Sequence, residues 1–201
     1  MIGIVNYGAG NIFSLTAALD RIEADYGMVD QEVDFERYDR IIIPGVGHAG
    51  AAMQKLQETG LVNRIVALQK PVLGICVGMQ LLTSFSEEGN ADLLDILPLK
   101  TLHFAGRIPD KVPHMGWNSI SPQNNCPLFE GIDDNSYFYF VHSYFIEFDS
   151  QYTSAVCQYG VSFSAAVQKG NFFGVQFHPE KSGSAGEQLL LNFSNLDVHI
   201  A

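Results

Sequence analysis

Cys76 is the residue whose surroundings most favour chemistry. It stands between Gly74 and Gly78, after the apolar run 72–75 and before an apolar helical pattern over 77–85. This is the form of a nucleophile elbow, where a sharp strand-to-helix turn strains the nucleophile's backbone and flanking glycines let other backbone approach. The start of the helix also favours a thiolate over a thiol. We predict that Cys76 is a nucleophile; the alternative is a small buried residue that ends a strand.

The other two cysteines have no such frame. Cys126 lies in a turn rich in Asn and Pro, and Cys157 lies within a predicted strand. We therefore expect both to be structural. Because the three cysteines are widely separated, with no Cys-x-x-Cys pair and no Cys/His cluster, the sequence predicts neither a disulfide framework nor a metal site.

A thiolate nucleophile needs a partner that accepts and donates protons, and His178 is the best candidate among six histidines. Only His178 is followed two residues later by a carboxylate, Glu180. Pro179 favours an extended backbone at His178, and residues i and i+2 of an extended chain project to the same side. Glu180 can then fix the imidazole tautomer and stabilise the imidazolium, as the third member of a triad does. The alternatives are a polar turn at this motif and His142 as the base, since His142 follows another predicted strand.

Acyl transfer also needs hydrogen-bond donors for the oxyanion that develops on the substrate. One candidate is the backbone amide of Val77, and a second lies in the Pro-Gly-Val-Gly loop, at Val46 and Gly47. That loop could equally be an ordinary turn at the end of a strand. Gln80 lies four residues after the cysteine on the same helical face, so its amide could hold a substrate carboxylate or amide, or fill a packing gap.

Apolar strands that alternate with helix-periodic segments predict an α/β fold with an open, mainly parallel sheet flanked by helices. The first half should contain strands at 2–5, 41–43 and 72–75, with helices over 15–25 and over 52–68, the latter interrupted near Gly60. Short aromatic or β-branched runs in the second half predict an antiparallel extension of the sheet. These runs are 137–141, 154–158, 164–168 and 172–177; a helix over 185–195 follows, and 109–127 is expected to form loops.

The composition fits one globular domain over residues 1–201 and opposes some classes of partner. The chain has 47% hydrophobic and 16% charged residues, and its 22 acidic residues against 11 basic ones give a net charge of −11. This acidity opposes nucleic acid and anionic membranes, which are bound through Lys and Arg. The N-terminus lacks the basic start and apolar run of a signal peptide, and no run of about 18 apolar residues occurs, so we expect a cytoplasmic protein without a membrane span.

Six strings, in this order along the chain, resemble one family. They are Asn6-Tyr7-Gly8-Ala9-Gly10-Asn11, Pro44-Gly45-Val46-Gly47, Gly74 to Gln80, Pro113-His114-Met115-Gly116-Trp117-Asn118, Tyr139-Phe140-Val141-His142-Ser143-Tyr144 and Gln176-Phe177-His178-Pro179-Glu180-Lys181-Ser182. The chain closely resembles, over nearly its whole length, the glutaminase subunits of imidazole glycerol phosphate synthase, which are class I glutamine amidotransferases of histidine biosynthesis. The elbow and His-Pro-Glu are common to class I glutaminases, whereas His-Met-Gly-Trp-Asn and the N-terminal Gly-Asn turn narrow the match to this subunit.

The resemblance implies a reaction on L-glutamine. The cysteine attacks the side-chain amide, the histidine protonates the leaving ammonia, and water hydrolyses the glutamyl thioester to give glutamate. Carried onto this sequence, the triad is Cys76, His178 and Glu180, the oxyanion donors are amides at Val46, Gly47 and Val77, and the residues near the bound glutamine are Gly47, Gln80, His142 and Ser143. No metal or organic cofactor is expected.

The resemblance also implies a partner, a (β/α)8 cyclase subunit that would form a heterodimer with this chain. The cyclase would receive the ammonia and make imidazole glycerol phosphate and an aminoimidazole carboxamide ribotide. Because free ammonia is protonated at neutral pH and lost, the partner should cover the active site. The positions that resemble the family's interface are Gly10, Asn11, Trp117 and Lys181, which on their own could be a turn, a core aromatic and a solvated lysine.

Two alternative functions stay open at this point. One is the glutaminase of another ammonia-channelling synthase, such as a pyridoxal phosphate or anthranilate synthase. The other is a catalytically silent subunit that only activates a partner, although an intact Cys76, His178 and Glu180 set argues against it.

Overall fold

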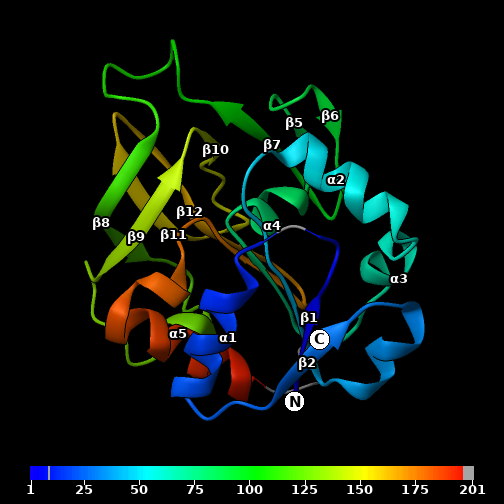
Figure 1. The fold of residues 1–201 in the computed structure, drawn as a ribbon. Helices are drawn as coiled ribbons and strands as arrows, with labels where there is room; N and C mark the ends of the chain where they lie inside the picture. Colours follow the sequence, from blue (N-terminus) through cyan, green and yellow to red (C-terminus); the bar gives the residue numbers. More distant parts are fainter. Residues whose placement is uncertain (9, 197–201) are drawn as a thin grey trace.

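The structure is a computed structural model that describes residues 1–8 and 10–196, and within them thirteen strands form one mixed sheet (Figure 1). The main strand order is β2-β1-β3-β4-β13-β12-β10-β7-β5-β6, and β11, β8 and β9 extend from β12. The first five strands in that order are parallel: β2 (Tyr26–Val29), β1 (Ile2–Val5), β3 (Arg40–Ile43), β4 (Val72–Ile75) and β13 (Phe172–Val175).

The remaining strands pair mostly antiparallel. They are β5 (Thr83–Ser86), β6 (Ala91–Asp92), β7 (Leu97–His103), β8 (His114–Pro122), β9 (Tyr137–His142), β10 (Tyr144–Glu147), β11 (Thr153–Tyr159) and β12 (Val161–Lys169). Only β5 and β7 are parallel among these pairs of the described chain. The predicted fold class, a mainly parallel sheet with an antiparallel extension, is confirmed.

Helices cover both faces of the parallel strands (Figure 1). The α-helices are α1 (Ile12–Arg21), α2 (Ala49–Glu58), α3 (Val62–Val66), α4 (Val77–Leu81) and α5 (Gly183–Asn195), and the 3₁₀ helices are η1 (Glu32–Arg37), η2 (Pro127–Phe129) and η3 (Pro179–Lys181). α1 joins β1 to β2, whereas α2 and α3 join β3 to β4 in the opposite direction along the sheet. Since such crossovers are right-handed, the two connections lie on opposite faces, with α5 packed beside α1.

Several predicted elements agree with these bounds. The strands at 2–5 and 72–75 are β1 and β4, and the predicted helix over 52–68 is divided near Gly60 into α2 and α3. The closing helix is α5. Among the described residues no helix has the length and apolarity that a membrane crossing requires. Ala9, within the predicted N-terminal turn, and residues 197–201 lie outside the described residues.

Three local predictions were wrong. The first helix begins at Ile12 and ends at Arg21 rather than near 25. The helix after the elbow ends at Leu81 rather than 85, because the Thr83 hydroxyl donates to the carbonyl of Gln80 (2.8 Å) and Thr83 then pairs with β7. Residues 109–127 are not only loops, since they contain β8, which pairs with both β9 and β11.

The register between β4 and β13 assembles the candidate site. Every residue of both strands is buried, and Ile75 pairs with Val175. The amide of Cys76 continues this ladder by donating to the carbonyl of Val175 (2.8 Å). Residue 176 therefore lies beside the cysteine, and His178 follows two residues later at the carboxyl end of the parallel strands, where open α/β sheets place their sites.

Candidate active site

The predicted elbow is present at Cys76. This residue joins β4 to α4 with φ 53° and ψ −110°, a left-handed conformation that costs about 1–3 kcal/mol for a residue with a side chain. The flanking glycines allow backbone contact. A Cβ on Gly78 would lie 1.9 Å from the carbonyl oxygen of Ile43, and one on Gly74 would lie 2.4 Å from the carbonyl oxygen of Gly78. The turn is therefore packed backbone against backbone.

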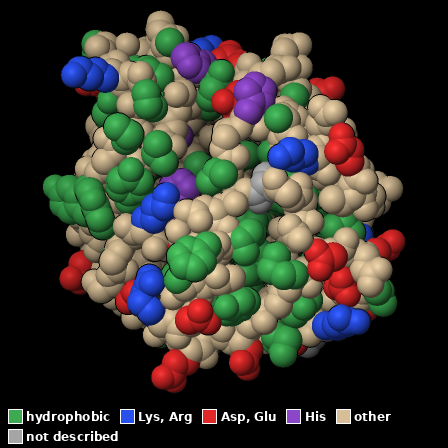
Figure 2. Space-filling model, in the orientation of Figure 1, with side chains coloured by type: hydrophobic (Ala, Val, Ile, Leu, Met, Phe, Trp, Pro, Cys, Tyr) green, Lys and Arg blue, Asp and Glu red, His purple; other side chains and the backbone are tan. Residues whose placement is uncertain are grey.

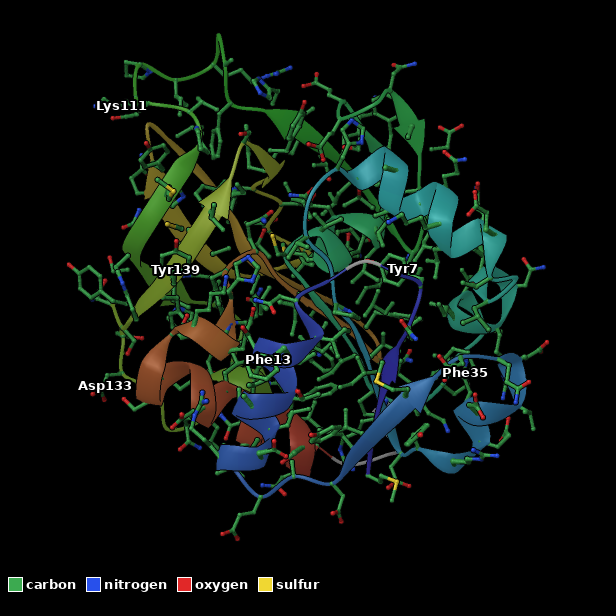
Figure 3. The ribbon with its side chains drawn as sticks, viewed as in Figure 1. Tyr7, Phe13, Phe35, Lys111, Asp133 and Tyr139 are labelled. Atoms are coloured by element: carbon green, nitrogen blue, oxygen red, sulfur yellow. The ribbon has the colours of Figure 1, made fainter. Side chains whose placement is uncertain are left out.

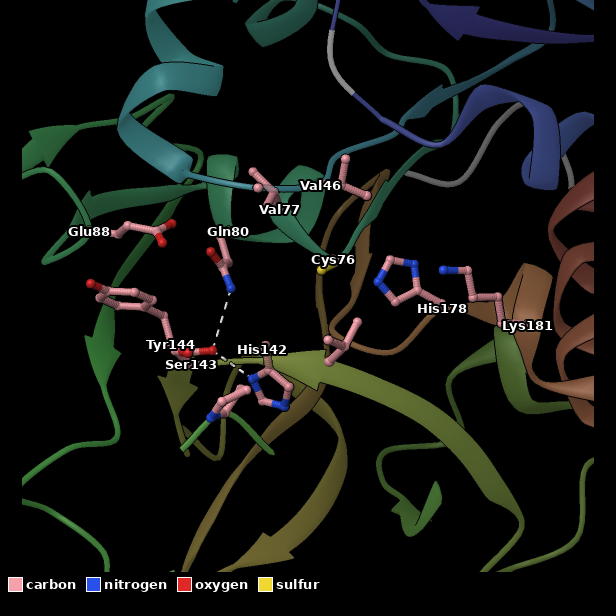
Figure 4. A pocket seen from close by; sticks show the side chains of 13 residues that line it. Val46, Cys76, Val77, Gln80, Glu88, His142, Ser143, Tyr144, His178 and Lys181 are labelled. Atoms are coloured by element: carbon pink, nitrogen blue, oxygen red, sulfur yellow. Dashed lines mark hydrogen bonds between the residues drawn. The ribbon is translucent and has the colours of Figure 1, made fainter. Parts of the chain in front are cut away.

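A cavity of about 390 Å³ opens over the sulfur (Figure 4). Most of the residues predicted from the sequence line it: Cys76, His178, Val46, Gly47, Val77, Gln80, His142, Ser143 and Lys181, together with Glu88, Pro113, Val141 and Tyr144. Glu180 lies behind the imidazole rather than in the cavity wall. The side chains of His178 and Glu180 are only 2% and 3% exposed.

His178 and Glu180 make the contact that their spacing predicts. Nδ1 of His178 lies 2.8 Å from Oε1 of Glu180, and because a carboxylate only accepts, Nδ1 carries the proton. His178 is extended (φ −100°, ψ 96°), and η3 follows directly. The loop is anchored to β9, because the amide of His178 donates to the carbonyl of Tyr139 (2.9 Å) and the Ser182 hydroxyl donates to the carbonyl of His178 (2.6 Å).

The imidazole of His178 is held in its charged form. Burial opposes protonation, but the adjacent Cys76 and the hydrogen bond and charge of Glu180 outweigh burial and raise the pKa of His178 to about 10. At neutral pH the ring is therefore a cation, and it lines the same cavity as Cys76. A cationic imidazole beside a cysteine is the arrangement that Cys–His nucleophiles use.

His142, the rival base, is committed elsewhere. Its Nδ1 lies 2.7 Å from the carbonyl oxygen of Tyr144, so Nδ1 must donate and Nε2 must accept from Nδ1 of His114, 2.9 Å away. Burial lowers the pKa of His142 to about 3, partly offset by the hydrogen bond to Tyr144, and burial lowers that of His114 to about 4. Both rings of this pair stay neutral, and neither nitrogen of His142 is free to take a proton from the cysteine.

The loop predicted to supply oxyanion donors approaches the cysteine. Gly47 has φ 89°, a conformation that favours glycine, and Val46 is half-exposed beside the cavity. The loop is held from below by Tyr7, whose hydroxyl donates to the carbonyl of Pro44 (2.5 Å). Burial, and next the negative charge at Cys76, raise the pKa of Tyr7, so this hydroxyl keeps its proton.

The amide of Gln80 is held by other groups of the protein. Its Nε2 donates to Oε1 of Gln176 (3.0 Å) and to the carbonyl of Tyr144 (3.4 Å), which uses both amide hydrogens. Its Oε1 is buried and has no hydrogen-bond partner in the described chain. Because Nε2 is engaged and Oε1 is buried, a contact between Gln80 and a substrate carboxylate is disfavoured relative to the packing alternative.

Tyr7, Gln176 and Glu88, which have polar roles in or beside this site, were not predicted from the sequence. Tyr7 and Gln176 belong to strings that resemble the family, and the i+2 argument applied to His178 could have been extended backward to Gln176. Glu88 has no such signal, because Glu-Glu-Gly reads as a solvated turn. In the structure its carboxylate lines the cavity and accepts from the amide of Ala49 (2.6 Å) at the start of α2.

Of the four predicted interface positions, only Lys181 lines the main cavity. Lys181 lines the cavity, with Nζ 5.8 Å from the centre of the Tyr139 ring. Trp117 is 56% exposed, so the alternative of a core aromatic is wrong. Asn11 caps α1 by accepting from the amide of Ser14 and lines a second, very small cavity behind His178 and Glu180. Gly10 (φ 108°) packs closely on Pro44.

The face of the molecule shown in Figure 2 carries large exposed hydrophobic side chains. Figure 2 shows them over α1 and over the β8–β9 pair, and Figure 3 shows Phe13 on the outer side of α1. The exposed fractions are 83% for Phe13, 67% for Met115 and 61% for Tyr137, besides Trp117. Several large apolar side chains exposed on one face are typical of an interaction surface.

Comparison with known proteins agrees with this geometry. The family Glutamine amidotransferase class-I matches residues 4–196. The chain is a class I glutamine amidotransferase. A crystal structure of a glutamine amidotransferase at 17% identity has the same fold, with a TM-score of 0.73 over 96% of each chain.

The chain is also similar to curated proteins of one subunit type. The chain is 48% identical over 195 residues to the imidazole glycerol phosphate synthase subunit HisH of Haemophilus influenzae. This alignment covers 96% of each of the two chains. The chain is 45% identical over 196 residues to the HisH subunit of Bacteroides fragilis, covering 97% of this chain and 99% of that one. This amidotransferase therefore belongs to the HisH family of synthase subunits of histidine biosynthesis.

Proposed function

We propose that this chain hydrolyses L-glutamine to glutamate and ammonia through a Cys76–His178–Glu180 triad. The observation that carries the proposal is the buried 2.8 Å contact between His178 and Glu180, with the imidazolium facing Cys76 in one cavity. The sulfur attacks the carboxamide carbon, and His178 gives its proton to the departing nitrogen. The neutral imidazole then takes a proton from the water that cleaves the thioester.

The cavity suggests how glutamine is oriented. Figure 4 shows Glu88 and Gln80 on one side of Cys76, and His178 and Lys181 on the other. The Glu88 carboxylate lines the cavity as an acceptor, which suits the substrate α-ammonium. With that end held, the side-chain amide reaches the sulfur, and ammonia departs on the side of His178 and Lys181.

Backbone amides of the elbow and of the 44–47 loop would stabilise the oxyanion. The amide of Val77 is the first of α4 and has no partner within its own helix, since the first amides of a helix point outward. Val46 and Gly47 also line the cavity, and their loop packs at Gly45 against Val77. Removing one such donor costs about 10²- to 10³-fold in rate in a related acyl-transfer site.

We further propose that a (β/α)8 cyclase subunit covers the cavity, forms a heterodimer with this chain and receives the ammonia in the cytoplasm. The exposed hydrophobic face around the cavity mouth, with Trp117 and Lys181 near it, supports this partner. The HisH relatives are named as subunits of imidazole glycerol phosphate synthase, which favours this cyclase over the partner of another ammonia-channelling synthase.

The test is glutamate release by wild type and by Cys76→Ala, each with the cyclase subunit and its nucleotide substrate present. Cys157→Ala is the matched control, because that thiol is buried in β11 outside the cavity. We expect Cys76→Ala to abolish release and Cys157→Ala to retain it. Equal rates for Cys76→Ala and wild type would refute the nucleophile, and partner activity that persists without any glutamine hydrolysis would favour a silent activating subunit.

A further inference from the structure

A chain of hydrogen bonds inside the protein ends at the nucleophile. The carbonyl of Tyr144 accepts from Nε2 of Gln80 (3.4 Å), the same nitrogen donates to Oε1 of Gln176 (3.0 Å), and Nε2 of Gln176 donates to the sulfur of Cys76 (3.7 Å). Gln176 is completely buried and Gln80 is 2% exposed. The triad mechanism makes no use of Gln176.

The direction of these bonds is dictated by the backbone. A carbonyl oxygen can only accept, so the Gln80 atom facing Tyr144 is the amide nitrogen. That nitrogen also faces Gln176, whose nearest atom must therefore be its oxygen. The other end of the Gln176 amide is then the nitrogen, and this end points at the sulfur. Reversing either amide would place two acceptors or two donors in contact within a buried site, at a cost of about 1–3 kcal/mol.

We propose that Gln176 is a positioning residue that holds the Cys76 sulfur as an anion by donating a hydrogen bond to it, with Gln80 fixing the direction of that donor. The inference rests on the proposed function of Cys76 as the nucleophile. The β4–β13 register explains how the donor is delivered, because residues 76 and 176 directly follow the paired Ile75 and Val175.

The donor acts on two steps. In the first, a sulfur lone pair forms the C–S bond, the carbonyl π pair moves to oxygen, and the C–N bond then breaks as His178 protonates the nitrogen. In the second, water adds to the thioester carbon and the C–S bond breaks, which returns its electron pair to sulfur. The sulfur is anionic before the first step and after the second, so a fixed N–H there favours the resting thiolate and its departure from the thioester.

The experiment measures the rate of alkylation at Cys76 by iodoacetamide against pH, read by mass spectrometry of the Cys76 peptide, in the full chain with and without the cyclase. The variants are Gln176→Met, which keeps the volume and removes the donor, and Gln176→Glu, which keeps the acceptor for Gln80 but presents an oxygen to the sulfur. Gln168→Met on β12 is the matched control. Circular dichroism and thermal unfolding check that each variant is folded.

We expect the pH midpoint of alkylation to rise by about one unit in Gln176→Met, which is about tenfold less thiolate at neutral pH, and to rise further in Gln176→Glu. Gln168→Met should match wild type. Thioester hydrolysis, followed as decay of the isolated acyl-enzyme, should slow in both Gln176 variants. A folded Gln176→Met or Gln176→Glu with the wild-type midpoint would overturn the inference while leaving the triad intact. Wild-type protein whose glutaminase survives complete Cys76 alkylation would instead overturn the proposed function.

Discussion

Replacing Glu180 by glutamine tests how much of the catalysis depends on charge beside His178. The two side chains are almost fully buried and 2.8 Å apart, so the bond between them is screened very little by water. A hydrogen bond involving a charged group is worth about 1.5–3 kcal/mol, which corresponds to about a tenfold to 150-fold loss of kcat/KM. His178→Ala removes the proton carrier itself and should cost more, up to about 10⁴-fold.

The structure explains why the glutamine variant should keep some activity. Oε2 of Glu180 is buried without a partner in the described chain, whereas Oε1 accepts from Nδ1 of His178. In Glu180→Gln the amide oxygen can occupy the Oε1 position and the amide nitrogen the Oε2 position. The imidazole then keeps the tautomer that directs Nε2 at the sulfur, and only the charge is lost.

Loss of the Glu180 charge should change how the activity depends on pH. The pKa of His178 is raised to about 10, so the imidazolium and its favourable interactions are present at neutral pH. Their contribution to folding stability is complete below the unfolded-state pKa of about 6.5 and is lost as pH rises through the folded-state value of about 10. Removing the Glu180 carboxylate lowers that upper limit, so the alkaline fall in activity should begin at lower pH than in wild type.

The assay is glutamate release with the cyclase partner present, measured from pH 6 to about pH 10.5, a range chosen to span the raised pKa of His178. Thermal unfolding of each variant shows whether the fold survives. If Glu180→Gln loses more activity than His178→Ala, or if its alkaline limb coincides with that of wild type, the carboxylate does not act through His178 and the triad assignment is wrong.

Three further predictions follow from buried or exposed groups. The pKa values of His114 (about 4) and His142 (about 3) are low, so below about pH 6.5 the unfolded chain binds more protons than the folded chain. The free energy of unfolding should therefore fall as the pH is lowered from about 6.5 toward about 3. Chemical denaturation at several pH values should show this slope, and His114→Phe should reduce it. Gly78→Ala would place a Cβ 1.9 Å from the carbonyl oxygen of Ile43. This overlap should lower the free energy of unfolding by about 1–3 kcal/mol or prevent assembly of the elbow. Unchanged thermal unfolding and activity would contradict the packing described. Trp117→Ala should leave the melting temperature within about 2 °C of wild type, because the Trp117 side chain is 56% exposed. The same variant should bind the cyclase at least about tenfold more weakly in calorimetry, as expected when an aromatic anchor is removed. Equal affinity would place the partner elsewhere.

The parts of the site predicted from sequence are those coded by adjacent residues. The Gly-x-Cys-x-Gly elbow and His-Pro-Glu are local strings, and the strain at one and the contact in the other follow from the backbone they impose. Gln176 and Glu88 became visible only in the structure, because their roles depend on pairing and packing between distant segments. The register of β4 against β13 has no local signature, and neither does the placement of Glu88 at the start of α2.

Errors in the fold arose where tertiary contacts override local preference. The apolar run after α4 has helical spacing, yet Thr83 and Phe85 pair with β7 and become a strand. The segment containing β8 reads as irregular because Pro113 begins it and Gly116, with φ 126°, interrupts it. Its partners β9 and β11 supply the hydrogen bonds that define it as a strand.

The pairing of Ile75 with Val175 also makes the cysteine a reporter of folding. Gln176 and His178 follow β13, about a hundred positions after the cysteine, so an activated thiol exists only after that long-range pairing has formed. A slip of one position between the two strands would point every side chain of the slipped strand to the other face. Pulse labelling of this thiol during refolding should therefore time the moment at which the central strands come into native alignment, without any need for substrate.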